Sequence, residues 1–379
     1  MPADLLALVG RDHEAAYGER ETIAWDLLAS ALKSLWAETC CLTLLAGAGT
    51  RWVKSLLAAK AGLAGALEDD LGRVTSGFPL DAPRGLFPVR NFISAEPSRI
   101  PMAAYAVDAL KGLGRHVIVI RGWEAEIRSE IIETLGIDEG MVSFCAQREG
   151  PSGKVLGHGD AARQSRRLWR DSRFVIANFG GDVNSPLTAL ASLLAMAKLD
   201  ESGEKSAGKV GLLLPVARIR NPAYPVILDE EGLPRAFGHN KLGGTAAGPA
   251  SSPPASGPAA PGIMLSASDS FAYTNVGIRV YKTEILSAAV DEIENSYWRD
   301  DIGYSIPGND PDAHEFALDN VDALLASRGE ARILAIANPE ELTPAKSFDE
   351  IGHFEEAARK VRAEWEKFRS TFPLANHRA

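Results

Sequence analysis

A glycine loop followed by an arginine is the first feature of the chain that could carry chemistry. The stretch 44–51, LLAGAGTR, ends an apolar run and places two glycines ahead of Thr50 and Arg51. Glycines let backbone N–H groups approach an anion closely, and the arginine adds positive charge, so the loop suits a triphosphate. It lacks the Gly-Lys-Ser/Thr ending of a Walker loop and the third glycine of the dinucleotide fingerprint. The loop therefore predicts phosphate binding of some other type.

A carboxylate after another apolar strand is the second such feature. Asp182 lies in the stretch 179–187, FGGDVNSPL, which follows the run RFVIAN and precedes a helical pattern. A carboxylate at the end of a strand suits a hard divalent cation bound alongside phosphate oxygens. The structural alternative is an aspartate that caps a helix or a turn. Asp182 is therefore a candidate metal ligand.

Further stretches place cations, amide side chains or glycines between predicted elements. They are RGLFPV at 84–89, Gln147 with LGHGDAA at 156–162, NPAYPV at 221–226 with FGHNK at 237–241, TNVGI at 274–278, EFALD at 315–319 and PAKSFDEI at 344–351. Each has an ordinary structural alternative, such as a loop histidine for His158 or a surface lysine for Lys54 and Lys346. The candidates are cations, glycines and a carboxylate, and they contain no Ser-His-Asp set.

Taken in order, these stretches resemble the motifs of the sugar-1-phosphate nucleotidyltransferases, over roughly residues 40–351. The loop at 44–51 is similar to the family signature Leu-x-x-Gly-x-Gly-Thr-Arg. The stretch 179–187 is similar to its Gly-Asp-x-Pro-Leu block, in which the aspartate binds Mg²⁺. The resemblance implies a Rossmann-like core of the GT-A type with Mg²⁺ as cofactor. It also implies a nucleoside triphosphate, UTP or dTTP, and a sugar 1-phosphate as substrates, with pyrophosphate as product.

The resemblance implies a role for each matching residue. The nucleotide would be bound by Ala46, Gly47, Gly49, Thr50, Gln147, Gly157 and His158. The charge of the phosphates would be offset by Arg51, Lys54, Arg84 and Lys346. The sugar would be bound by Tyr224, Asn240, Asn275 and Gly277, and the metal by Asp182.

Three positions depart from the family pattern. Arg84 stands where the family has the lysine of a Lys-x-Leu-x-Pro-Val block, and Lys54 is the alternative source of that charge. Asn240 stands where a glutamate usually contacts the sugar, so the sugar is not identified. Lys346 stands where many bacterial members have a metal-binding asparagine. It is similar instead to the Pro-x-Lys motif of the UDP-glucose and UDP-N-acetylhexosamine pyrophosphorylases, which places an ammonium near the phosphates.

Apolar runs alternate with helical patterns along most of the chain. Strand-like runs follow residue 39 and recur at 116–120, 141–147, 173–182, 209–219, 225–232, 273–281 and 331–337. Helical patterns occupy 102–114, 125–136, 160–172 and 186–199. This alternation predicts an α/β fold with a mixed, mostly parallel sheet covered on both faces. The strand-rich part at 209–281 predicts a more antiparallel region, which would form a sugar-binding lobe.

Three parts are expected along the chain. Residues 1–38 form a helical extension, since apolar residues recur at helical spacing between Thr22 and Glu38. Residues 39–351 form the catalytic domain, and 352–379 form a tail with an amphipathic helix. Within the catalytic domain, the stretch 243–262 consists almost entirely of Gly, Ala, Ser and Pro. Such a composition cannot bury a core, so it predicts a flexible insertion.

The bulk properties are those of a globular enzyme. The chain has 379 residues, 46% of them hydrophobic, and a net charge of −10. Nucleic-acid binding usually needs a basic face, so it is not expected. The longest apolar runs are too short for a membrane span, and the acidic first residues do not resemble a signal peptide. Cys40, Cys41 and Cys145 fit no disulfide framework. We expect a cytoplasmic enzyme, and the sequence leaves a homo-oligomer open.

Two other functions remain as alternatives. A relative that senses nucleotides or sugars without catalysis would explain the departures at Arg84 and Asn240. A glycosyltransferase of the same fold typically has Asp-x-Asp at its metal, and residues 182–184 offer Asp-x-Asn. The loop at 44–51 argues against the glycosyltransferase, because that class does not handle pyrophosphate as a leaving group.

Overall fold

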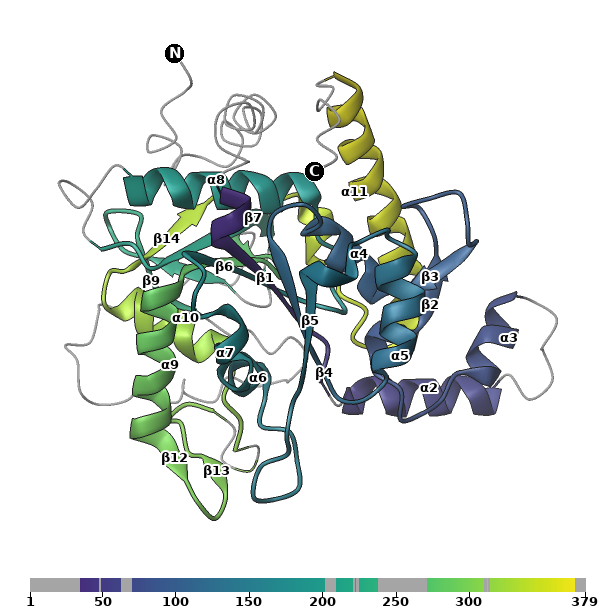
Figure 1. Cartoon of the computed structure of the whole chain (residues 1–379), viewed down its shortest axis with the longest axis horizontal. Coiled ribbons are helices and arrows are strands. Elements are labelled where there is room, and N and C mark those ends of the chain that lie inside the picture. The colour runs from purple at the N-terminus through teal and green to yellow at the C-terminus, as the bar shows by residue number, and fades with distance from the viewer. Residues whose placement is uncertain are drawn as a thin grey trace.

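A mixed sheet forms the centre of the molecule (Figure 1). The computed structural model describes residues 35–47, 49–62, 70–201, 209–220, 222, 225–237, 271–309, 312 and 314–371. Within these residues the sheet has eight strands in the order β10-β7-β11-β6-β1-β4-β5, with β14 also paired to β7. The strands are β1 (Thr39–Leu44), β4 (Arg115–Ile120), β5 (Val142–Ala146), β6 (Phe174–Phe179), β7 (Leu212–Arg220), β10 (Phe271–Asn275), β11 (Arg279–Lys282) and β14 (Ala331–Leu334).

The sheet has a parallel half and a more antiparallel half. β1 pairs in parallel with β4 and β6, and β4 pairs in parallel with β5. β11 runs antiparallel between β6 and β7, and β10 runs antiparallel to β7. β14 returns to the parallel direction beside the first residues of β7. This arrangement confirms the predicted mixed α/β sheet and its antiparallel region at 209–281.

Helices cover both faces of the sheet. They are α2 (Thr50–Gly62), α3 (Asp70–Gly77), α4 (Ala103–Ala109), α5 (Glu124–Ile127, continued by a π-helical segment Arg128–Glu133), α6 (His158–Gln164), α7 (Arg166–Trp169), α8 (Pro186–Glu201), α9 (Thr283–Tyr297), α10 (Leu318–Ser327) and α11 (Ile351–Thr371). Figure 1 shows α8 on one side of the sheet and α6, α7, α9 and α10 on the other. Burial on both faces explains why β1, β4 and β6 are continuous apolar runs in the sequence.

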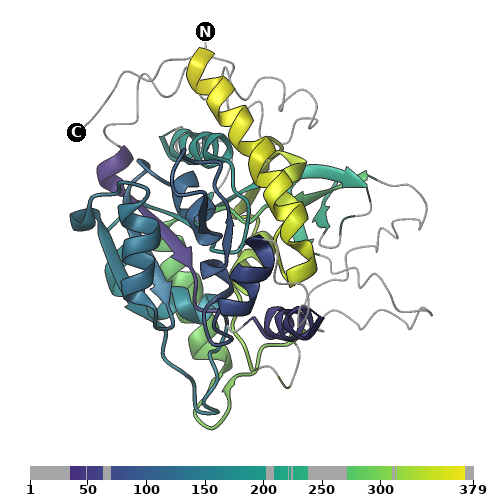
Figure 2. The same ribbon diagram turned by 90° about the vertical axis from the view of Figure 1, so that its right-hand side faces the viewer.

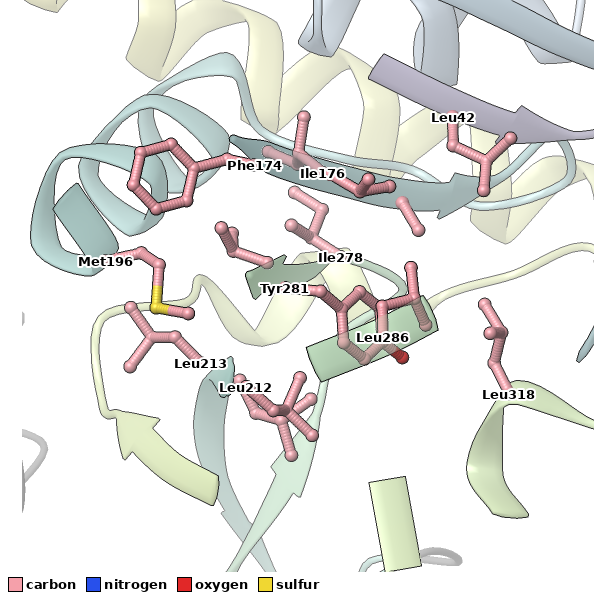
Figure 3. Close-up of a cluster of buried hydrophobic side chains, with 14 of the residues drawn as sticks. Leu42, Phe174, Ile176, Met196, Leu212, Leu213, Ile278, Tyr281, Leu286 and Leu318 are labelled. Carbon is pink, nitrogen blue, oxygen red and sulfur yellow. The ribbon is translucent and has the colours of Figure 1, made fainter. Parts of the chain in front are cut away.

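The main hydrophobic core lies between the sheet and these helices. Figure 3 shows side chains of β6, β7 and β11 meeting those of α8 and α9, with Ile176, Leu212, Tyr281, Met196 and Leu286 among them. A second buried cluster lies under α2, α4 and α11. It includes an aromatic group in which Trp52 packs edge-on against Phe87, with ring centroids 5.2 Å apart. In the stretch after β6, Val183 belongs to this second cluster and Leu187 belongs to the main core.

Smaller elements surround this centre. Three two-stranded sheets pair β2 (Pro88–Arg90) with β3 (Arg99–Pro101), β8 (Val226–Leu228) with β9 (Pro234–Phe237), and β12 (Trp298–Arg299) with β13 (Gly303–Tyr304). Short 3₁₀ turns lie at Arg84–Leu86, Glu139–Met141, Pro339–Leu342 and Phe348–Glu350. Figure 2 shows α11 lying along the outside of the molecule, which confirms the predicted C-terminal helix. Across the described residues, no helix has both the length and the apolar character that a membrane crossing requires.

Two predicted elements are wrong in detail. The run 273–281 is not one regular strand, because β10 and β11 pair with successive residues of β7, 216–220 and 212–213, and residues 276–278 form a bulge between them. The helical pattern 160–172 forms two short helices that meet at Ser165, where the chain makes a turn. The N-terminal helical extension lies outside the described residues except for its last turn, residues 35–38. The insertion 243–262 also lies outside them, and the domain boundaries stay predictions.

Candidate active site

The loops that carry the predicted chemistry leave two neighbouring parallel strands. β1 and β6 pair along their whole length, so that Leu44 lies beside Phe179. The glycine loop leaves the carboxyl end of β1, and the loop 180–185 leaves the carboxyl end of β6. Because β4 lies on the other side of β1, the strand order reverses between β1 and β6. Open α/β sheets bind ligands at such a point of reversal.

The side chain of Arg84 lies on the loop that carries Asp182. A Cβ on Gly181 would collide with the Nη2 atom of Arg84, so the guanidinium lies directly on the glycine backbone. Burial lowers the pKa of Arg84 from its usual value, and the nearby Asp182 carboxylate opposes this shift. Neither side chain forms a hydrogen bond or an ion pair with another described residue. A cation and a carboxylate are thus held close together and remain available to a ligand.

Asp182 lies among cations from three separate segments of the chain. Burial raises the pKa of its carboxyl, and Arg84, Lys346 and Arg279 act to lower it. Arg84 and Lys346 are 262 residues apart in the chain, so only the fold brings them together. The structure therefore places two of the predicted phosphate-binding cations, Arg84 and Lys346, around the predicted metal ligand.

The segment between β10 and β11 also lies against Asp182. A Cβ on Gly277 would collide with the Oδ2 atom of Asp182, so this position needs a glycine for the carboxylate to fit. Asn275 is the last residue of β10, and its half-buried side chain has no hydrogen bond within the described part of the chain. One predicted sugar-binding residue, Gly277, thus lies next to the predicted metal ligand, and Asn275 precedes it by two residues. Tyr224 and Asn240 lie outside the described residues.

Hydrogen bonds hold the loop that carries Lys346. The backbone N–H groups of Lys346 and Ser347 donate to Oε2 of Glu350 at 2.5 and 3.1 Å. The backbone N–H of Phe348 donates to the hydroxyl oxygen of Ser55 in α2 at 2.8 Å. The loop is therefore fixed to the helix that follows the glycine loop, and Glu350 places a second carboxylate near Arg84.

The glycine loop leads directly into α2. Ala46 is buried, whereas Gly47 is exposed and has no atom within 4 Å of the position that its Cβ would occupy. Gly49 has a φ angle of 57°, which favours glycine. Thr50 is the first residue of α2, and the free N–H groups at the start of a helix favour an anion. The open space at Gly47 would let a phosphate approach the backbone.

Arg51 and Lys54 lie on the exposed side of α2. No contact among the described residues ties either of them to Asp182. Of Arg84 and Lys54, the two candidates for the family lysine, Arg84 is therefore the one that lies beside Asp182. A role for Arg51 and Lys54 toward the phosphates stays a prediction.

Contacts within the protein hold the predicted base-binding residues. Nε2 of Gln147 donates to the backbone oxygen of Gly157 at 2.8 Å. Nδ1 of His158 accepts the backbone N–H of Leu318 at 2.8 Å. The His158 ring packs edge-on against Phe179, with ring centroids 4.8 Å apart. Burial lowers the pKa of His158 to about 4, so the ring is neutral near pH 7 and can accept this bond. Recognition of a base by these residues stays a prediction.

Arg279 is a charged residue beside Asp182 that the motifs do not predict. It is only 3% exposed, and its guanidinium donates to Asp322 at 2.7 Å and to Asp319 at 2.6 Å. Burial works to lower the pKa of Arg279, but the two carboxylates raise it overall. The detectable signal is an arginine inside the apolar run VGIRVY, because a charged residue is rarely buried unless it is paired.

The balance of positive and negative side chains around Asp182 decides whether a divalent cation fits there. Arg84, Lys346 and Arg279 lie among the carboxylates of Asp182, Glu350, Asp319 and Asp322. These cations do not outnumber the carboxylates, so they leave no excess of positive charge for bound phosphates. Mg²⁺ is commonly held by one or two carboxylates together with substrate oxygens. The unpaired carboxylate of Asp182 fits such a site, although the described residues form no cluster of three metal-binding side chains.

Buried polar side chains fix the loop after Asp182. Asn184 is 3% exposed, and its Oδ1 accepts a bond from Nδ2 of Asn178 at 3.1 Å. Glu341, also unpredicted, accepts from the N–H of Ser185 at 2.9 Å and from the Thr188 hydroxyl at 2.6 Å, which caps α8. Asn184 therefore belongs to the core, where its amide oxygen is already bonded within the protein.

No protein-family model matches the sequence, and no curated protein matches it. Among solved structures, the chain is similar to a protein from Entamoeba histolytica that is assigned as a UDP-N-acetylglucosamine pyrophosphorylase. The TM-score is 0.42 and the identity 10%, over 77% of this chain and 67% of that chain. No conclusion about the site or its activity follows from a similarity of this size.

Proposed function

We propose that this protein is a sugar-1-phosphate nucleotidyltransferase, which joins UTP or dTTP to a sugar 1-phosphate and releases pyrophosphate. The observation that carries the proposal is the meeting of Arg84, Lys346 and Gly277 around Asp182, at the point where the strand order reverses. Each of these residues belongs to a different motif of the resemblance. Residues that match motifs by chance would have no reason to converge on one carboxylate.

The proposed reaction requires alignment and charge compensation more than acid–base chemistry. An oxygen of the sugar 1-phosphate attacks the α-phosphorus, a new P–O bond forms, and the bond to the β-phosphate breaks to release pyrophosphate. The attacking oxygen is already an anion near neutral pH, so no general base is needed. His158 is neutral and its Nδ1 is occupied by a backbone N–H, which suits a site without a general base.

The cations of the site have a clear electrostatic role in this proposal. Arg84 can donate several hydrogen bonds in one plane to phosphate oxygens, and Lys346 adds a compact positive charge. Held in fixed positions, such groups stabilise the charge that develops during phosphoryl transfer. Mg²⁺ bound by Asp182 and by substrate oxygens would supply the positive charge that the side chains lack. The backbone at Gly47 and Gly49 would hold the triphosphate.

The decisive assay is pyrophosphate release from a matrix of nucleoside triphosphates and sugar 1-phosphates, with Mg²⁺ and with EDTA. We expect release that requires both substrates and the metal. Asp182→Ala should abolish Mg²⁺-dependent turnover while circular dichroism and thermal unfolding show an intact fold. Near-normal turnover by a folded Asp182→Ala variant would overturn the metal assignment. Silence of the wild type across the whole matrix would overturn the proposed activity.

The two alternative functions have less support. A glycosyltransferase loses its motif argument, because Asn184 is buried and bonded within the core. A sensor without catalysis was suggested by the exchange of lysine for Arg84, yet this arginine lies beside Asp182 with its hydrogen-bond donors available. Binding of UTP by calorimetry without pyrophosphate release would support the sensor.

A further inference from the structure

The buried side chain of Arg279 connects several segments that meet at the candidate site. Its Nε atom donates to Oδ2 of Asp322 at 2.7 Å, and its Nη2 atom donates to Oδ1 of Asp319 at 2.6 Å. The guanidinium also lies 4.9 Å from the centroid of the Phe179 ring. Through this one side chain, β11 bonds to the first turns of α10 and packs on the end of β6.

The same contacts reach the glycine-rich loop at 157–158. His158 packs edge-on against Phe179 and accepts the N–H of Leu318, the first residue of α10. Its Nε2 atom lies 3.8 Å from Oδ2 of Asp319, which Arg279 also binds. The predicted nucleotide-binding residues at 157–158 therefore contact the Phe179 ring and the start of α10, and Arg279 contacts both.

The contacts also extend to Asp182. The backbone N–H of Asp182 donates to the backbone oxygen of Phe179 at 3.2 Å, so the position of one affects the other. Gly277, two residues before Arg279, lies against the carboxylate of Asp182. Arg279 acts on Asp182 electrostatically as well, because its charge opposes the rise in the pKa of that carboxyl. Asp182 and the loop at 157–158 are thus the two ends of one connected group.

We propose that Arg279 is a positioning residue, which fixes the end of β6 to α10 and so keeps the loop at 157–158 and Asp182 in one relative position. The names of the ligands at the two ends rest on the proposed function, whereas the contacts do not. Arginine suits this task because its planar fork serves two carboxylates while its flat face packs on an aromatic ring. Lysine at this position would keep the charge, but it could not bond both carboxylates through a planar group or pack a flat face on the Phe179 ring.

One of the two acceptors of Arg279 is itself held in place. Asp322 is 1% exposed and accepts a second bond, at 2.6 Å, from the hydroxyl of Tyr281, which lies on β11 like Arg279. Asp319 lies in the first turn of α10 with its side chain 60% exposed, so its bond to Arg279 is the less constrained one. Close-packed interiors transmit strain, so a displacement of Arg279 reaches α10 mainly through Asp322.

The first test uses hydrogen exchange of the unliganded protein, so it does not depend on the activity. Arg279→Lys should speed exchange of amides at 157–160, 179–182 and 316–320 by about tenfold or more, the size expected when one hydrogen bond between charged groups is lost. Exchange in β4 and α11 should stay unchanged. The matched control is Arg328→Lys, since Arg328 pairs with Glu292 at the surface. Wild-type exchange at 157–160 and 179–182 in Arg279→Lys would overturn the proposal.

The second test separates this inference from the proposed function. In an active wild type, Arg279→Lys should lower kcat and raise the Mg²⁺ concentration for half-maximal rate, by about tenfold each, because Asp182 is misplaced. Unchanged values would overturn the link to Asp182. An inactive wild type would overturn the proposed function, while the exchange result would still decide the role of Arg279.

If Arg279→Lys does not fold, Tyr281→Phe removes one bond to Asp322 without a charge change. The Tyr281→Phe variant should speed exchange at the same amides by a smaller factor, and wild-type exchange at those amides would overturn the proposal.

Discussion

Gly277, one of the predicted sugar-binding residues, lies against the carboxylate of Asp182, and alanine at this position should displace that carboxylate. A Cβ on Gly277 would collide with Oδ2 of Asp182, and the φ angle of Gly277 lies outside the left-handed region, so the collision is not accompanied by backbone strain. Relief requires a shift of the carboxylate by about 1 Å, and a misplacement of that size can cost roughly 100-fold in rate. That loss corresponds to about 2.7 kcal/mol of activation free energy.

The stability of the Gly277→Ala variant should change much less than its activity. The carboxylate of Asp182 is half-buried and has no bond to another described residue, so it can rotate away from a new methyl group. We expect the free energy of unfolding to fall by about 1 kcal/mol, at the low end of the cost of overpacking. Denaturant unfolding measures this value, and pyrophosphate release over a range of Mg²⁺ concentrations measures kcat and the metal dependence.

The matched control is Gly77→Ala at the end of α3. A Cβ on Gly77 would have no atom within 4 Å, so this variant should match the wild type in rate and in metal dependence. A folded Gly277→Ala variant with wild-type kcat and an unchanged Mg²⁺ requirement would refute the reasoning. It would show that the position of Asp182 does not matter to the reaction.

Three further changes test other parts of the structure. Gly47→Ala should leave stability unchanged, because its Cβ would meet no atom within 4 Å. If phosphates approach that backbone, it should weaken the binding of UTP, measured by calorimetry, by about tenfold. The control Gly62→Ala, whose Cβ also meets no atom within 4 Å, should bind UTP like the wild type, and equal affinities of the two variants would refute the loop assignment. Arg84→Lys should keep about a tenth of the rate and Arg84→Gln much less, since lysine keeps the charge but not the planar fork; equal rates in the two variants would contradict an electrostatic role. Burial lowers the pKa of His116 from 6.5 to about 4. Between these pH values the His116 side chain binds a proton in the unfolded chain but not in the folded one. The free energy of unfolding should therefore fall by about 3 kcal/mol as the pH drops from 6.5 to 4. Denaturant unfolding across this range should show a smaller fall in His116→Leu but not in His353→Leu, whose histidine is exposed; an unchanged fall in His116→Leu would rule out this source.

The parallel half of the sheet and the long helices could be predicted from the sequence because their signals are local. Strands buried on both faces, such as β4 and β6, are continuous apolar runs that end at polar or glycine residues. α8 and α11 show apolar periodicity over several turns. These elements are confirmed within a few residues of their predicted bounds.

The split of the run 273–281 could not be predicted in this way. Its residues read as one apolar strand, and nothing local marks the interruption at 276–278. The interruption is a bulge in the pairing with β7, because the chain advances five residues from Asn275 to Val280 while β7 advances three, from Val216 to Leu213. The bulge also places Gly277 against Asp182.

The candidate site shows the same division between local and distant signals. Asp182, Arg84 and Lys346 could be found from motif order, because each motif occupies its own short stretch. Arg279 could not, because its importance depends on α10, which is 40 residues further along the chain and supplies Asp319. The internal bonds of His158 could not be foreseen either, because its partner Leu318 is 160 residues away.

The departure of Arg84 from the family pattern is structurally consistent with its surroundings. A guanidinium is wider than an ammonium, and here it lies where a Cβ of residue 181 would be. The extra width is accommodated because residue 181 is a glycine, so the arginine at position 84 and the glycine at position 181 fit each other sterically. The donor groups of Arg84 are not used by other described residues, so they remain available to a ligand. Under the proposed function, Arg84 supplies beside Asp182 the positive charge that a lysine supplies in the motif it resembles.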